Sequence, residues 1–165
     1  MIANLVKELQ TQFGEAQVQI IEGEKQDTIR VDVAVLVPLC YHLRDTELYY
    51  FDFLSNITAV DYHPENRFAL VYNLASIPYQ TQLTIRVELN MENRNVDNLP
   101  EVPSISQVWR TADWHEREAF DLMGIYFTDH ADLRRILLPD DWEGFPLRKD
   151  YEDPEFYHGI SVKGE

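Results

Sequence analysis

Cysteine is almost absent from this chain of 165 residues, and the single Cys40 excludes an internal disulfide and cannot alone hold a zinc ion or an iron–sulfur cluster. It lies in the apolar run VLVPLCYHL, where a buried reduced thiol is the ordinary interpretation. No segment approaches the ~18 uninterrupted apolar residues of a membrane-spanning helix, and the N-terminus lacks the basic and apolar regions of an export signal. We therefore expect a protein of a reducing compartment that neither spans a membrane nor carries an export signal.

Basic residues are also scarce, because 14 Lys and Arg stand against 29 Asp and Glu, which gives a net charge of -15. This charge repels nucleic acid phosphates and anionic lipid headgroups. The charge therefore argues against a direct role on DNA, RNA or an acidic membrane surface, and we expect neutral or basic protein partners.

Motifs for cofactor and nucleophile chemistry are lacking: the chain has no GxGxxG, no P-loop and no GxSxG elbow. His115 and Glu118 stand at positions i and i+3 of one predicted helix, a spacing used in carboxylate-bridged two-metal sites. Such sites need several helices of this kind, and no second pair follows here. A free-standing metal-dependent enzyme that uses His115 and Glu118 is therefore kept as an alternative hypothesis.

What the sequence does contain is an apolar fraction of 45% and 12% aromatic residues, which indicates a folded chain. Apolar residues at helical spacing predict a helix over residues 2–13, ended by Gly14. Residues 28–37 predict a strand that becomes buried on both faces, and Pro38 then opens a helix predicted over residues 39–54.

Period-two alternation marks the middle of the chain and predicts three neighbouring antiparallel strands at ITAVDY, FALVYNLAS and TQLTIRVELN, between residues 57 and 90. Residues 91–103 are polar and contain prolines, which is typical of a linker. Ser104 and Gln107 match a capping box, so a helix is predicted from there to Gly124, followed by a short strand. We predict an α+β fold: a single domain at residues 1–127, with a small, mainly antiparallel sheet packed by helices.

Residues 128–165 have no sustained period and are predicted to form a long irregular C-terminal arm. Its residues 142–157 include 5 aromatics in 16 positions, too many for a segment with no core of its own. These aromatics either pack back on the same domain or are covered by a partner protein. They are Trp142, Phe145, Tyr151, Phe156 and Tyr157.

The predicted helix carries charges whose partners have to be found. Glu116 is the one charged residue on a mostly apolar stripe and needs a hydrogen-bond donor, whereas Arg117 and Asp121 are spaced to pair along the solvent side. Donors are available in the arm, and we predict that they lock the arm to the helix; solvated charges on exposed turns are an equally good interpretation of the spacing. These donors are Arg134, Arg135, Arg148 and Lys149.

The run WHEREAFDLMGIYFTDHADLRRILLPDDWEGFPLRKDY resembles the signature of the thirty-kilodalton subunit, also called the C subunit, of proton-pumping NADH:quinone oxidoreductase, respiratory complex I. ITAVDY and PSISQVW are also similar to this family. The chain departs from the family pattern where Ala131 replaces a proline and Phe145 replaces a histidine. The residues that carry the resemblance are Glu116, Arg117, Glu118, Asp121, Gly124, Phe127, residues 130–137 and residues 146–151.

The resemblance implies a non-catalytic, cofactor-free subunit packed against the large quinone-site subunit and near the iron–sulfur subunits, with FMN and the iron–sulfur clusters held by those partners. It implies a peripheral location at the cytoplasmic face of the inner membrane, or the matrix side in mitochondria, with membrane association only through the complex. Relatives in ferredoxin-fed and hydrogenase-type complexes leave the electron donor open. Residues expected to order the arm and face partners are Glu116, Arg117, Glu118, Asp121, His130, Asp132, Arg134, Arg135, Trp142, Pro146, Arg148, Lys149, Asp150 and Tyr151.

Overall fold

The computed structural model describes residues 2–91 and 94–162. Its first element is helix α1 (Ile2–Phe13), which buries Leu5, Val6 and Leu9 on one face, as the apolar spacing predicted. Gly14 follows with φ of 104°, a left-handed conformation that ends the helix.

The segment after α1 differs from the prediction. Strands β1 (Val18–Ile21) and β2 (Thr28–Val31) form an antiparallel hairpin, so the strand predicted over residues 28–37 is too long. Asp32 ends it by accepting a hydrogen bond from the Ala34 N–H, 2.9 Å away, which starts the 3₁₀ turn η1 (Val33–Val35). A short apolar run has no period that separates a strand from a buried helix, which is why this boundary was wrong.

Helix α2 (Leu36–Asp45) is also shorter than the helix predicted over residues 39–54. Pro38 lies in its first turn, where a missing N–H breaks no helical hydrogen bond. After Asp45 the chain turns, and the aromatic residues near position 50 lead into a strand.

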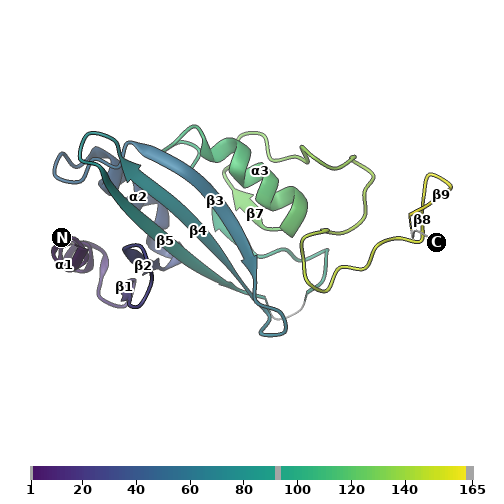
Figure 1. Ribbon diagram of the computed structural model, residues 1–165, viewed down its shortest axis with the longest axis horizontal. Coiled ribbons are helices and arrows are strands. Elements are labelled where there is room, and N and C mark those ends of the chain that lie inside the picture. The colour runs from purple at the N-terminus through teal and green to yellow at the C-terminus, as the bar shows by residue number, and fades with distance from the viewer. Residues whose placement is uncertain (1, 92–93, 163–165) are drawn as a thin grey trace.

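A five-stranded sheet forms the centre of the molecule (Figure 1). Its order is β1-β2-β5-β4-β3, and β2–β5 is its one parallel pairing. The inner face of β4 buries Phe68, Leu70 and Tyr72 in the core, as its alternation predicted. The long strands are β3 (Phe53–Asp61), β4 (Arg67–Ser76) and β5 (Thr81–Asn90).

The segment between the sheet and the last helix is more structured than predicted. Strand β6 (Glu101–Pro103), inside the predicted linker, pairs in parallel with β7 (Tyr126–Thr128). Residues 92 and 93 of that linker lie outside the described residues. The helix predicted from Ser104 begins only at Ala112; the Ser104 hydroxyl accepts the Ser106 N–H of a short turn that precedes the helix, and it also donates to Glu116.

Helix α3 (Ala112–Met123) lies beside β3, and the C-terminal arm runs past its end (Figure 1). The arm has no regular structure until a small hairpin of β8 (Phe156–Tyr157) and β9 (Ile160–Ser161), at the opposite end of the molecule from α1. Its residues 163–165 lie outside the described part of the chain. The predicted α+β fold is confirmed, and no helix in the described residues is long and apolar enough to cross a membrane.

Candidate functional site

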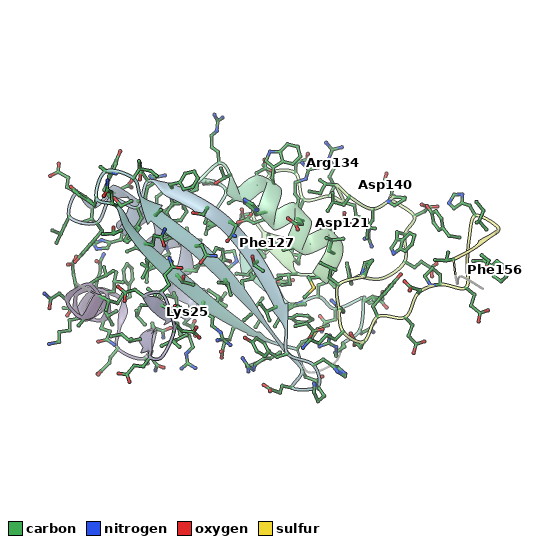
Figure 2. All side chains as sticks on the ribbon, viewed as in Figure 1. Lys25, Asp121, Phe127, Arg134, Asp140 and Phe156 are labelled. Carbon is green, nitrogen blue, oxygen red and sulfur yellow. The ribbon has the colours of Figure 1, made fainter. Side chains whose placement is uncertain are left out.

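The end of α3 binds the C-terminal arm through a buried carboxylate, Asp121 (Figure 2). One of its oxygens accepts the backbone N–H groups of residues 136–138 at 3.1, 2.7 and 3.0 Å, and the other accepts Arg135 Nη1 at 2.8 Å. Burial opposes ionisation, but these donors together lower the pKa of Asp121 below its ordinary value. The predicted pair between Arg117 and Asp121 is therefore wrong, because the carboxylate faces inward.

Arg135 extends this contact to a more distant part of the arm. Its Nη2 donates to the carbonyl oxygens of Trp142 and Gly144, at 3.1 and 3.0 Å. One guanidinium thus joins α3 to two turns of the arm, which is the kind of link between helix and arm that the sequence predicted.

Arg148 caps the C-terminus of α3. Its Nε donates to the Met123 carbonyl at 2.8 Å and its Nη2 to the Gly124 carbonyl at 3.1 Å. These carbonyls have no partner inside the helix, and a cation also suits the negative end of the helix dipole. The prediction that Arg148 binds a carboxylate of the helix is therefore wrong; burial, with Arg94 nearby, lowers its pKa.

Two phenylalanine rings separate the guanidinium groups of this region. Phe145 lies between Arg135 and Arg148, with its ring centroid 5.4 and 4.6 Å from the two Cζ atoms. Phe68 on β4 lies in the same way between Arg148 and Arg94, at 5.4 and 4.9 Å. The residue that departs from the family pattern at position 145 is thus a buried ring between two cations.

Arg94 joins the arm to the sheet. Its Nη1 donates to the buried Asp61 carboxylate at the end of β3, 3.0 Å away, and its Nη2 to Asp150 at 2.8 Å. The Lys149 N–H also donates to Asp61, at 2.9 Å, so Lys149 acts through its backbone. Hydrogen bonding to Asp150, and then to Asp61, raises the pKa of Arg94 despite its burial.

Glu116 is fully buried on the inner face of α3. It accepts a hydrogen bond from the Ile105 N–H at 2.7 Å and from the Ser104 hydroxyl at 2.5 Å. Its donors therefore come from the segment before the helix, and the prediction that they come from the arm is wrong. Burial raises the pKa of Glu116 to about 7, against the lowering effect of these two hydrogen bonds. The nearest cationic candidate, His130 Nε2, is 3.8 Å from the carboxylate.

The buried ring of His130 is fixed by two backbone groups. Its Nδ1 accepts the Asp132 N–H at 3.1 Å, and its Nε2 therefore carries the proton and donates to the Asp113 carbonyl at 3.2 Å. This arrangement ties the start of the arm to the first turn of α3.

Residues 29–157 match the family model described as "Respiratory-chain NADH dehydrogenase, 30 Kd subunit". The chain belongs to this family. This confirms the resemblance drawn from the signature run.

Proteins similar to this chain include three that are named as the C subunit of NADH-quinone oxidoreductase. That of Moorella thermoacetica is 40% identical over 90% of this chain and 93% of its own length, and that of Geotalea uraniireducens is 41% identical over 93% and 92%. That of Chloroherpeton thalassium is 44% identical over 75% of this chain but 49% of its own length. The matched region thus spans about half the length of this last relative.

The fold of this chain also occurs in one chain of a solved structure. That structure is described as the membrane-bound sulfane sulfur reductase (MBS), an archaeal respiratory membrane complex. The TM-score is 0.72 at 22% identity, with coverage of 91% of this chain and 85% of that one. At this identity the likeness establishes the shared fold.

The outer side of α3 carries the remaining family signature charges. Arg117 is largely buried beneath the exposed Trp114, with its Cζ 5.1 Å from that ring, and its Nε lies 3.5 Å from the Arg134 carbonyl. The Arg134 side chain is exposed and pairs with Asp132 at 3.0 Å. Arg134 and Asp132 therefore match the solvated charges of the second sequence interpretation, whereas Arg117 is buried.

His115 and Glu118 line one cavity of about 290 Å³ between α3 and β3. Within residues 2–91 and 94–162, no group of three or more His, Cys, Asp or Glu side chains is placed to hold a metal ion. Leu147 of the arm also lines this cavity although it is largely exposed, and its N–H donates to the Leu122 carbonyl, just after the half-buried Pro146.

Three of the five aromatic side chains of the arm, those of Trp142, Tyr151 and Tyr157, contact one another. Trp142 Nε1 donates to the Tyr151 hydroxyl at 3.1 Å, and its ring lies 5.0 Å from that of Tyr157. Asp141 accepts hydrogen bonds from the Tyr157 hydroxyl and from His158. Phe156 stays 65% exposed at the far end of the arm (Figure 2), and Leu137, Leu147 and Ile160 of the arm are also exposed.

Sequence reasoning missed Asp61 and Arg94, which hold the arm to the sheet. Asp61 is the D of ITAVDY, and a carboxylate at the buried end of a strand was a usable signal. Arg94 lies in a polar segment that gave no such signal, because nothing local shows that it faces inward.

Proposed function

We propose that this chain is a non-catalytic scaffold subunit in the peripheral part of a proton-translocating NADH:quinone oxidoreductase. In this proposal it lies at the cytoplasmic face of the inner membrane, or the matrix side in mitochondria, and reaches the membrane only through its partners. FMN and the iron–sulfur clusters are held by partner subunits, and electrons pass through those groups from NADH to quinone. Family membership and the names of the three relatives support the assignment.

The observation that carries the proposal is how the family signature is used. Apart from the ion pair between Asp121 and Arg135, the polar atoms of Asp121, Arg135 and Arg148 bind backbone groups of this same chain, so these residues shape the arm and offer no reacting atom to a substrate. The arm that they hold exposes large apolar side chains, including Leu147 at 58% and Phe156. Fixed apolar side chains in solvent are typical of a surface that a partner covers.

We further propose that residues 128–165 are the docking arm and residues 1–127 the domain that carries it. The partners proposed for the arm are the large quinone-site subunit and the iron–sulfur subunits. Within the signature, Asp121, His130, Arg135, Arg148 and Asp150 order the arm. The proposed interface then includes exposed or half-buried members: Glu118, Asp132, Arg134, Trp142, Pro146, Lys149 and Tyr151.

The test is recovery of the tagged chain from native membranes in mild detergent, with mass spectrometry of the proteins that accompany it. We expect quinone-site, iron–sulfur and flavin subunits with the natural chain, and a marked loss with Leu147→Glu. Ile20→Glu is the matched control, since Ile20 is also an exposed apolar residue but lies on β1, away from the arm. Recovery of the chain without any oxidoreductase subunit would contradict the assignment.

The set of subunits recovered in the same experiment also identifies the electron donor. Flavin subunits that accept NADH support the proposal as written, whereas ferredoxin-binding or hydrogenase subunits would move the same scaffold role to a relative of the complex. Elemental analysis of the purified chain tests the metal-dependent enzyme hypothesis, because an active-site metal at His115 and Glu118 would appear near one equivalent.

A further inference from the structure

A second apolar surface lies at the end of the molecule opposite the arm, between α1, the α2–β3 loop and the β4–β5 turn (Figure 1). It surrounds a cavity of about 590 Å³ whose floor contains the buried Leu5, Phe51 and Leu83. Leu48 and Tyr79 stand on its rim, 71% and 52% exposed. We call this cavity and its rim the α1 groove.

The loops that form the α1 groove are held in place by hydrogen bonds. The Tyr79 hydroxyl donates to the Glu47 carbonyl at 2.7 Å, and the Ile77 N–H donates to Asp52 at 2.9 Å. The Tyr49 hydroxyl on the groove wall donates to Glu8 of α1. The rim side chains are therefore exposed to solvent on loops that are already ordered, so a ligand can bind them without the entropy cost of ordering these loops.

The charges that line the α1 groove or fix its loops are acidic, and His42, which lies 3.1 Å from Glu8, is outside the lining. Asp27 lines it, and the carboxylates of Glu8 and Asp52 belong to residues that fix its wall and rim. Among the described lining residues there is no Lys, Arg or His. A second copy of this chain, with a net charge of -15, is a poor occupant because the same acidic rim would face it. A partner segment that is apolar on one side and basic at its edges fits both features.

The shape of the α1 groove selects a helix over a strand. Its lining comes from a helix, a loop and the ends of strands around the β4–β5 turn; β4 is paired on both sides, whereas β5 pairs with β2 only at residues 84–86. The unpaired edge of β5 beside the groove is thus limited to residues 81–83, which is shorter than a strand of usual length, about five to six residues. An amphipathic helix places apolar side chains at i, i+3 and i+4 into such a groove and leaves its Lys and Arg for the rim.

We propose that the α1 groove is a second docking site, which binds a basic amphipathic helix of another subunit of the same complex. This inference rests on the proposed function, since it assumes that the chain is one subunit among others. It makes the chain a bridge, with the arm on one partner surface and the α1 groove on another.

The test is site-specific photo-cross-linking in the purified complex, with p-benzoylphenylalanine at position 48 and, as control, at position 20. We expect position 48 to link to a peptide of another subunit with at least two Lys or Arg and apolar residues three or four apart, and position 20 not to reach that peptide. A link to an acidic or irregular peptide, to lipid, within this chain or to a second copy would overturn the proposal, as would no link.

A variant in the assembled complex gives an independent readout. Leu48→Asp should weaken retention of the cross-linked subunit about tenfold, because burial of one leucine contributes roughly that factor. The melting temperature of the chain should not change, since Leu48 is mostly exposed. Unchanged retention would overturn the proposal while the complex itself stays intact. If the chain recovers no oxidoreductase subunit at all, the proposed function fails, and this inference fails with it.

Discussion

Replacement of Glu116 by glutamine should make the folded chain more stable at neutral pH. In the folded chain the pKa of Glu116 is raised from 4.5 to about 7, so between these values the folded state binds a proton more tightly than the unfolded state. Stability contributed by this group therefore falls as pH rises from 4.5 to 7. A buried carboxylate that is ionised above pH 7 lowers the free energy of unfolding by about 3 kcal/mol relative to its neutral form.

Glutamine keeps the shape and the acceptor that faces the Ile105 N–H. Its amide nitrogen faces the Ser104 hydroxyl, which already accepts the Ser106 N–H at 3.1 Å and lies 2.7 Å from the Ser106 hydroxyl, so the Ser104 proton has another acceptor. The advantage of Glu116→Gln over the natural chain should grow by about 2.5 kcal/mol between pH 5 and pH 8.

Urea unfolding at pH 5, 6, 7 and 8 measures this difference, and subtraction of the two curves removes the groups far from Glu116, which contribute equally in both proteins. Ser104→Ala is the control, because loss of a donor to the carboxylate should steepen the fall of stability with pH. A difference between Glu116→Gln and the natural chain that does not change with pH would refute the reasoning. It would mean that the hydrogen bonds of Ser104 and Ile105 fully offset the burial of the charge.

Three further substitutions test the packing around α3. Gly124→Ala should lower the unfolding free energy by more than about 1 kcal/mol, and by more than Gly23→Ala does. Both glycines have positive φ, but only a Cβ at position 124 would meet Arg148 and Phe145, at 2.5 Å. Comparison of the melting temperatures of the two variants tests this. Asp121→Asn should cost about 3 kcal/mol and speed proteolytic cleavage within residues 128–150, because Arg135 loses a buried ionic partner; unchanged cleavage would contradict this. Tyr72→Phe should leave stability unchanged or raise it by up to about 1 kcal/mol, because the buried Tyr72 hydroxyl finds no acceptor among the described residues; a clear drop in the urea midpoint would show that it has one.

The parts of this fold that could be predicted are those whose signal is local. Strands β3 to β5 follow from alternation that reports directly on one buried face, and Gly124 marks the end of α3 because a left-handed residue is least strained as glycine. The resemblance rested on the same kind of local evidence, a run of characteristic residues.

The errors arose where a residue's partner lies far along the chain. Asp121 is spaced correctly for a helical pair with Arg117, but three backbone N–H groups fifteen to seventeen residues later outcompete that weak surface pair. Ser104 has the pattern of a cap and its hydroxyl accepts the Ser106 N–H, but the same hydroxyl also donates to the buried Glu116 and reduces the cost of burying it. Spacing cannot show such choices, because it contains no information on which side of an element becomes the interior.

The cap that Arg148 supplies to α3 sets an order of events in synthesis. The helix ends at Met123, but the carbonyls of Met123 and Gly124 receive their hydrogen bonds from Arg148. At ~5–20 residues per second, Arg148 is added to the chain about a second or more after them. Until position 148 leaves the ribosome, α3 has an open end and Phe145 has no place between its cations. A nascent chain that stalls before that residue therefore carries an unfinished helix, and the last quarter of the sequence completes the fold of the part made before it.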